Sequence, residues 1–122
     1  MSDDLIARFT AIVGEKNALR DPADQISYLS EPRELFHGRA ALVLRPATVD
    51  EVSAIMQLAY ETATPVVPQG GNTGLVGAQQ PDTSGRAIIL SLSRLNQIRN
   101  IDTTGNLVTV EAGVILQNLQ EA

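Results

Sequence analysis

The sequence predicts an α+β fold, because a strand–helix–strand pattern and an antiparallel hairpin occur in one short chain. The strand–helix–strand pattern covers residues 41–68. The turn Asp102-Thr103-Thr104-Gly105 separates two short extended segments at 97–101 and 106–110. Between the two units lies a glycine-rich stretch at 68–77, which follows a strand as ligand loops do in open α/β sheets. We therefore expect a parallel unit, a glycine loop and a hairpin, in that order.

Two helices are expected ahead of the parallel unit. Residues 4–15 carry apolar side chains at helical spacing, which is typical of an amphipathic helix. Asp21 and Pro22 mark a second helix start, with Asp21 as N-cap and Pro22 at the first helical position. The stretch that follows has no regular pattern. We divide the chain into an N-terminal helical extension, 1–40, and a main fold, 41–122.

The main fold begins with residues 41–44, a continuous apolar run that indicates a strand buried on both faces. Thr48 and Glu51 have the spacing of a capping box, so a helix of about 13 residues should begin there. Residues 65–68 restart an extended segment and 87–91 form another apolar strand. The first two strands and their helix thus form a βαβ unit.

The end of the chain indicates a helix that opens after Gly113 and continues through 114–119. The sequence stops after about two helical turns, with no glycine to terminate them. A helix this short is marginal alone. We therefore expect the 122 residues to be a fragment of a longer protein.

Composition excludes several classes of function. The chain has no cysteine, which excludes disulfides, thiolate metal sites and cysteine nucleophiles, and its only histidine is His37. We expect His37 to face solvent or cap an element, and we expect no metal site. A net charge of −5 disfavours nucleic acid as a partner. No apolar run reaches membrane-span length, and the acidic N-terminus is unlike a signal peptide, so a cytoplasmic location is expected.

The glycine-rich stretch has the composition of an anion-binding loop. Glycines permit positive φ and let a ligand approach backbone N–H groups without meeting a Cβ. A dinucleotide fingerprint is absent, since neither Gly70 nor Gly71 starts its glycine pattern. A P-loop is absent because Gly77 is followed by Ala78 rather than lysine. No lysine or arginine lies between Arg45 and Arg86, so a diphosphate here would be held by amides and hydroxyls. A surface loop without a ligand remains the alternative.

Four stretches resemble the FAD-binding domain of the vanillyl-alcohol oxidase and p-cresol methylhydroxylase superfamily, and they are similar to its branch of FAD-linked D-2-hydroxy acid dehydrogenases. That branch includes D-lactate, D-2-hydroxyglutarate and glycolate-oxidising enzymes. The stretches are Leu44 to Val52, Pro65 to Gly77, Leu90 to Ile98 and Val110 to Val114. The run Gly-Gly-Asn-Thr-Gly-Leu-Val-Gly is the most specific of them. The resemblance implies the first subdomain of a p-cresol methylhydroxylase-type FAD-binding domain.

The resemblance also implies a role for individual residues. Pro46 would lie near the adenine, and Ala112, Gly113 and Val114 would approach the cofactor from the hairpin and the last helix. The loop residues would follow the pyrophosphate and then the ribityl chain, and they are Pro68, Gln69, Gly70, Gly71, Asn72, Thr73, Gly74, Leu75, Gly77 and Ala78. Covalent-flavin relatives carry histidine where this chain has Asn72, so the FAD should be non-covalent.

The implied function is an oxidoreductase that oxidises a D-2-hydroxy acid by hydride transfer to flavin N5. No residue here is a convincing base, so we assign no catalytic residue, and the electron acceptor is left unspecified. The 122 residues alone would be inactive. Two alternatives stay open: a flavin reductase of the enolpyruvyl-sugar type, and a small non-catalytic α/β module that binds an anion or a protein.

Overall fold

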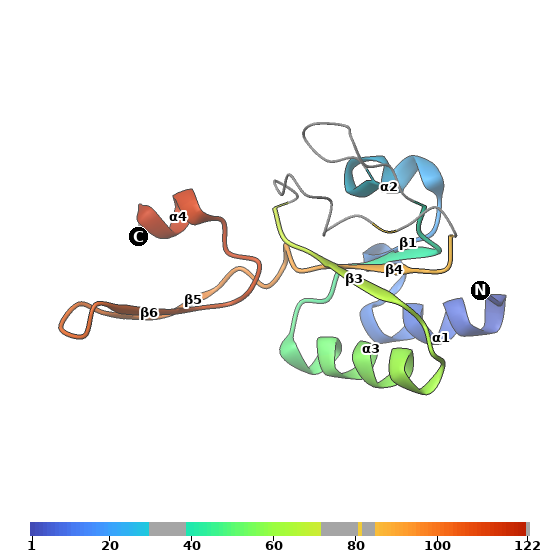
Figure 1. The fold of residues 1–122 in the computed structure, drawn as a ribbon, viewed down its shortest axis with the longest axis horizontal. Coiled ribbons are helices and arrows are strands. Elements are labelled where there is room, and N and C mark those ends of the chain that lie inside the picture. Colours follow the sequence, from blue (N-terminus) through green and yellow to red (C-terminus); the bar gives the residue numbers. More distant parts are fainter. Residues whose placement is uncertain (30–38, 72–80, 82–84, 122) are drawn as a thin grey trace.

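The computed structural model describes residues 1–29, 39–71, 81 and 85–121. A four-stranded sheet with helices on both faces forms one part, and a hairpin with a short helix extends from it (Figure 1). The helices are α1 (Asp3–Val13), α2 (Pro22–Leu29), α3 (Val49–Glu61) and α4 (Leu116–Gln120), with a 3₁₀ turn at Glu15–Asn17. The strands are β1 (Ala18–Leu19), β2 (Leu42–Leu44), β3 (Val66–Gln69), β4 (Ile88–Ser91), β5 (Ile98–Asp102) and β6 (Leu107–Val110).

The sheet has the order β1-β2-β4-β3, so β4 lies between the two strands of the βαβ unit. β4 pairs in parallel with β2 through Leu42 and Ile88, and in parallel with β3 through Val66 and the same Ile88. β1 pairs antiparallel with β2 at the other edge. The sequence pattern predicts the βαβ order, but it carries no information on which strand occupies the central position.

Residues from α1 share the core of the main fold. Phe9 of α1 is fully buried beside Leu44 of β2 and Ile55 of α3. Figure 1 shows α1 and α3 on one face of the sheet and α2 on the other. Alternate residues of a strand face opposite sides, so Val43, which is also fully buried, faces the α2 side. Residues 1–29 thus belong to the same layered unit, and the boundary at residue 40 stays a prediction.

Local sequence signals begin the helices as expected. Thr48 Oγ1 accepts the N–H of Glu51 at 3.1 Å, which is the forward half of the capping box. The reverse half is shifted by one residue, because Glu51 Oε1 accepts the N–H of Ala47 at 2.6 Å instead of that of Thr48. At α2, Asp21 Oδ1 accepts the N–H of Ala23 at 2.9 Å, which confirms the N-cap prediction.

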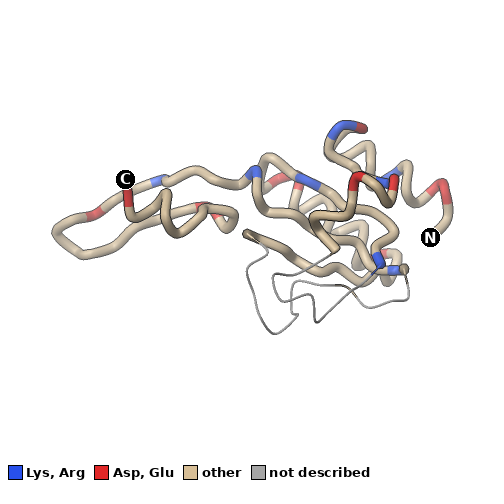
Figure 2. The backbone as a smooth tube through the Cα atoms, turned by 90° about the horizontal axis from the view of Figure 1, so that it is seen from above, with Lys and Arg blue, Asp and Glu red and all other residues tan. Residues whose placement is uncertain are grey.

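β5 and β6 form the predicted antiparallel hairpin, which lies outside the four-stranded sheet. We call β5, β6 and α4 together the arm. Figures 1 and 2 show, in two views turned by 90°, that the arm extends away from the sheet. Within the described ranges, every helix falls short of the length and apolar character that a bilayer crossing requires.

Candidate functional site

The candidate site lies where β3 ends. β3 is an edge strand, which suits its Pro68, since an edge strand tolerates a residue without an N–H group. The Leu92 N–H donates to the Gln69 carbonyl at 2.9 Å and extends the β3–β4 ladder by one bond. Gly70 and Gly71 follow directly, so they leave the sheet beside the turn that follows β4.

A pocket of about 150 Å³ brings three segments together at this point. The exit of β3, the turn after β4 and the start of α4 each supply part of its wall. Its lining residues are Gly70, Gly71, Ser93, Asn96, Ile98, Gly113, Val114, Ile115 and Asn118. Four of these residues are ones that the sequence predicts as cofactor-binding: Gly70, Gly71, Gly113 and Val114. The first two and the last two are more than 40 positions apart in the chain.

Gly70 and Gly71 are exposed, and nothing among the described residues requires glycine at either position. Among the described glycines, positive φ occurs at Gly14 and Gly85. A Cβ built on Gly70 or Gly71 would meet no described heavy atom within 4 Å. The expected positive φ is therefore not the reason for these glycines. The second expected reason, free access to the backbone, agrees with the lack of any described atom beside either Cβ position.

Gly113 differs, because it is packed against the chain itself. A Cβ on Gly113 would lie 1.6 Å from the Leu92 carbonyl oxygen and 2.8 Å from that of Leu95. The Gly113 N–H donates to the Leu95 carbonyl at 2.8 Å. The close approach expected at this glycine is thus made to the turn after β4. Its N–H is already engaged, although the residue lines the pocket.

No lysine or arginine is among the residues that line this pocket in the described part of the chain. Two arginines lie near the same edge of the sheet, where Arg94 Nη1 donates to the Arg45 carbonyl at 2.7 Å. Arg45 Nε is buried and has no hydrogen-bond partner among the described residues. An anion in the pocket would be held by backbone amides and polar side chains, as the sequence led us to expect.

The other expected site residues lie elsewhere. Pro46 is fully buried, and Pro68 is exposed on β3. Gln69 is 2% exposed and its Nε2 donates to the Tyr28 carbonyl at 2.9 Å, so its side chain ties α2 to the sheet. Ala112 lines a different, largely apolar pocket. The remaining expected residues lie outside the described ones, as does His37: Asn72, Thr73, Gly74, Leu75, Gly77 and Ala78.

Three polar residues of the pocket were not predicted from the sequence, namely Ser93, Asn96 and Asn118. Ser93 and Asn96 belong to a stretch that resembles the superfamily, but no site residue was taken from it. A signal was available, because the turn after β4 lies at the same carboxyl edge as the turn after β3. Asn118 lies in α4 and has no such positional signal.

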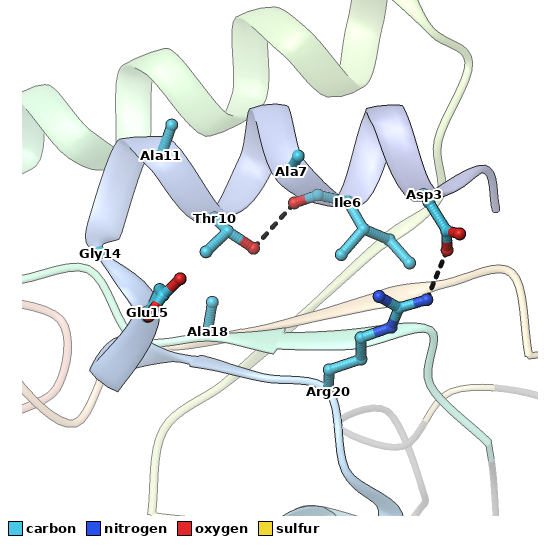
Figure 3. A pocket seen from close by; sticks show the side chains of 9 residues that line it. All are labelled: Asp3, Ile6, Ala7, Thr10, Ala11, Gly14, Glu15, Ala18 and Arg20. Carbon is cyan, nitrogen blue, oxygen red and sulfur yellow. Dashed lines mark hydrogen bonds and ion pairs between the residues drawn. The ribbon is translucent and has the colours of Figure 1, made fainter.

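A larger pocket of about 520 Å³ lies between α1 and β1 (Figure 3). Thr10 donates to the Ile6 carbonyl at 2.8 Å, and Arg20 pairs with Asp3 at its rim. Both members of that ion pair are mostly exposed. None of the expected site residues lines this pocket. The smaller pocket therefore remains the candidate site, since it is the one that gathers them.

Comparison with known proteins identifies the family of this chain and several relatives. Residues 40–122 match the family described as FAD binding domain. The chain is 34% identical to the mitochondrial D-2-hydroxyglutarate dehydrogenase of Arabidopsis thaliana, over 93% of this chain and 20% of that protein. It is also 34% identical to the D-2-hydroxyglutarate–pyruvate transhydrogenase of Saccharomyces cerevisiae, over 98% of this chain and 24% of that protein. The chain thus spans a quarter or less of the length of these relatives.

Solved structures show the same fold at lower sequence identity. Alkyldihydroxyacetonephosphate synthase matches with a TM-score of 0.85 and 19% identity, over 99% of this chain and 24% of that one. p-Cresol methylhydroxylase matches with a TM-score of 0.75 and 22% identity, over 98% of this chain and 24% of that one. The chain therefore belongs to the family of FAD-binding domains, with the fold of the p-cresol methylhydroxylase type.

Proposed function

We propose that this chain contributes FAD-binding residues to an oxidoreductase that oxidises a D-2-hydroxy acid. The family supplies the cofactor class, and the names of the relatives supply the substrate class. One structural observation carries the proposal. Gly70 and Gly71 line the same pocket as Gly113 and Val114, and nothing in the described fold requires glycine at the first two positions.

Glycine without a structural need costs stability. In a strand or helix interior, glycine lowers the stability of a protein by about 0.5–1 kcal/mol relative to alanine, because a glycine residue loses more conformational freedom on folding. At Gly70 and Gly71 an alanine would meet no described atom and would have an ordinary φ. Access of a ligand to the backbone accounts for two successive glycines at this position, since a side chain would cover the N–H groups.

The residues present fit a phosphate-bearing cofactor. Gly70 and Gly71 are exposed residues whose backbone forms part of the pocket wall, and Ser93, Asn96 and Asn118 supply short polar side chains around the same pocket. The Gly113 amide is committed to Leu95, so that glycine contributes space and not a donor. These residues would bind and orient the diphosphate region. When bound, FAD would supply flavin N5 as the hydride acceptor for oxidation of the carbon that bears the substrate hydroxyl.

Three finer statements belong to the same proposal. The FAD is held without a covalent bond, because Asn72 offers no nucleophilic ring nitrogen. The substrate is a small 2-hydroxy acid of D configuration. Cytoplasmic location stays a prediction. The name of the Arabidopsis thaliana relative gives a mitochondrial location, and that of the Saccharomyces cerevisiae relative gives no location.

The test compares two valine substitutions in the protein expressed from its complete gene. Gly71→Val places a β-branched side chain in the pocket and should abolish FAD retention. Ala11→Val adds similar bulk to the larger pocket beside α1 and should leave FAD retention unchanged. Bound FAD is measured from flavin absorbance per mole of folded protein. Equal FAD content in both variants would contradict the proposed site.

The substrate class is tested separately on the unmodified protein. Bleaching of the flavin absorbance is followed after addition of D-lactate, D-2-hydroxyglutarate, their L enantiomers or NADPH. Bleaching by a D acid and not by its enantiomer supports the proposal. Bleaching by NADPH alone would favour the enolpyruvyl-type reductase instead.

A further inference from the structure

Glu111 lies at the joint between the sheet and the arm, and all of its polar groups are engaged. Its Oε1 accepts the Gln97 N–H at 3.0 Å, and its Oε2 accepts a hydrogen bond from Arg99 Nη2 at 3.1 Å. Its backbone N–H donates to the Gln97 carbonyl at 2.9 Å, and its carbonyl accepts the Val114 N–H at 3.2 Å. Glu111 and Gln97 are thus joined by a reciprocal pair of hydrogen bonds.

The Glu111 carboxylate is only slightly exposed, although its partners Gln97 and Arg99 lie at the surface. The Glu111 side chain is 12% exposed, whereas that of Arg99 is 54% exposed. Hydrogen bonds to a charged acceptor are stronger than neutral ones, and they are screened less when they are withdrawn from water. The Glu111–Gln97 bond should therefore hold its geometry better than an ordinary surface ion pair.

A backbone irregularity brings Arg99 to this carboxylate. The β5–β6 register pairs Ile98 with Val110 and Asn100 with Thr109, so Arg99 is the extra residue of a bulge. Bulges re-aim side chains and bend the strand that contains them. The bulge lies at the root of the hairpin, and there the guanidinium reaches Glu111.

The joint is also anchored to the strand that carries the glycines. Leu92 donates to the Gln69 carbonyl, and Gly113 donates to the Leu95 carbonyl in the turn that begins at Leu92. Gln69 immediately precedes Gly70. A short series of hydrogen bonds therefore links the end of β3 to the residues before α4.

The pocket walls lie on both sides of this joint. Gly70 and Gly71 belong to the sheet side, whereas Val114, Ile115 and Asn118 belong to the arm side. The arm extends from the sheet in both views of the fold (Figures 1 and 2). Its angle at the joint consequently sets the separation of the two walls. Glu111 itself does not line this pocket but lines the apolar pocket of about 430 Å³ that Ala112 also lines.

We propose that Glu111 is a positioning residue for the FAD site, which holds the arm at the angle where α4 faces Gly70 and Gly71. The inference rests on the proposed function for the identity of the ligand. The part that concerns the arm angle does not depend on it. Glu111 acts through Gln97 and Arg99, and we assign it no contact with the cofactor.

The arm angle is measured directly by the distance between two spin labels. In the protein expressed from its complete gene, with any cysteine outside the 122 residues replaced by serine, Tyr60→Cys on α3 and Gln120→Cys on α4 place one label on each side of the joint. Tyr60 is 87% exposed, and Gln120 is also exposed. We expect a narrow distance distribution with Glu111 present. Glu111→Leu, which removes both side-chain interactions, should broaden it.

Two further variants separate the two interactions. Glu111→Gln keeps an acceptor for the Gln97 N–H but loses the charge that faces Arg99, and Arg99→Met loses the ion pair alone. Both should keep the narrow distribution if the Gln97 bond sets the angle. Asp3→Asn breaks an exposed ion pair beside α1 and serves as the control. A narrow distribution in folded Glu111→Leu would overturn the proposal.

FAD affinity is then measured in the same variants of the complete gene product, at temperatures where thermal unfolding shows each to be folded. Glu111→Leu should weaken FAD binding about tenfold or more, which matches the loss of a hydrogen bond to a charged group. Glu111→Gln should restore affinity to within about threefold, which a purely destabilising change at this site would not predict. Unchanged affinity in Glu111→Leu would overturn the positioning role.

The outcomes distinguish this inference from the proposed function. If the unmodified protein does not bind FAD, the proposed function fails, whatever the label distances show. If it binds FAD and Glu111→Leu changes neither distance nor affinity, the positioning role alone fails. If Glu111→Leu does not fold, Glu111→Ala replaces it, since it also removes both side-chain interactions. A broadened distribution and weaker binding in Glu111→Ala relative to Asp3→Asn then supports the proposal, and the absence of both contradicts it.

Discussion

Gly113 lies directly against the carbonyl of Leu92, so closely that a Cβ on Gly113 would fall 1.6 Å from the Leu92 oxygen. The contact joins the residue before α4 to the turn after β4. It is independent of any ligand, since both groups belong to the chain. Gly113 and Gly70 therefore line one pocket for different reasons, and substitution should separate those reasons.

Gly113→Ala should destabilise the fold, because the new methyl group overlaps the Leu92 carbonyl, which cannot move without disturbing the hydrogen bond that it accepts from the Leu95 N–H. Overpacking of this kind costs about 1–3 kcal/mol, and we expect the upper end here. Urea unfolding followed by circular dichroism measures the free energy of unfolding. Gly70→Ala is the matched control and should stay within about 0.5 kcal/mol of the unmodified protein. Equal losses in the two variants would mean that the contact is not as close as described.

The N-terminus of α3 offers a local test of stability. Thr48→Ala removes the acceptor of the Glu51 N–H and should cost about 1 kcal/mol, as N-cap losses do. Thr48→Ser keeps the hydroxyl and should lie within a few tenths of a kcal/mol of the unmodified protein. Thermal unfolding of both variants tests this prediction. A loss in the serine variant as large as that in the alanine variant would assign the effect to the Thr48 methyl group.

Gln69 provides a test of a residue that was expected to bind the cofactor. Its amide donates to the Tyr28 carbonyl at 2.9 Å from a side chain that is 2% exposed. Gln69→Leu should therefore destabilise the fold by about 1–3 kcal/mol, because the partly buried Tyr28 carbonyl loses its donor. FAD affinity, measured well below the unfolding temperature, should change little. A large loss of affinity with unchanged stability would return Gln69 to the cofactor site.

The sequence predicted most of the elements because their signals are local. Thr48 and Asp21 mark helix starts through hydrogen bonds to residues two or three positions away, and both bonds are present. β1 was missed because Ala18 and Leu19 are too short a segment to show a period. Its pairing with β2 arises from tertiary packing, on which a local pattern carries no information.

The site residues could be predicted from the sequence where they are glycines next to a strand or a helix. They could not be predicted where long-range packing brings them to the pocket. Gly70 and Gly113 are unusual residues after a strand and before a helix, so each drew attention from the sequence. Their meeting in one pocket depends on the joint at Glu111, which involves Gln97 and Arg99. Asn118 joined the pocket through that same packing, and nothing in its local sequence marks it.

The 122-residue chain on its own should bind FAD weakly. The pocket in the described residues holds about 150 Å³, whereas sites for drug-sized ligands enclose roughly 300–1,000 Å³. It suits a diphosphate better than a whole dinucleotide. Isothermal titration of FAD into the purified chain tests this, with pyrophosphate as the comparison. Tight stoichiometric binding of FAD would show that the chain supplies a complete site.

Several large apolar side chains of the arm are exposed to solvent. Leu107 is 65% exposed and Val108 is 45% exposed on β6, and Leu116 on α4 is 66% exposed. Because their burial contributes little to the fold described here, Leu107→Thr should change the free energy of unfolding by no more than about 0.5 kcal/mol.

The same substitution should reduce self-association of the 122-residue chain, since exposed apolar strands pair readily with other chains. Sedimentation velocity at increasing concentration measures this, and Met56→Thr on α3, where Met56 is 47% exposed, is the matched control away from the arm. If the control reduces association as much as Leu107→Thr does, self-association is not specific to the apolar surface of the arm. If Leu107→Thr instead lowers stability by several kcal/mol, Leu107 is buried in a contact that the isolated fold does not show.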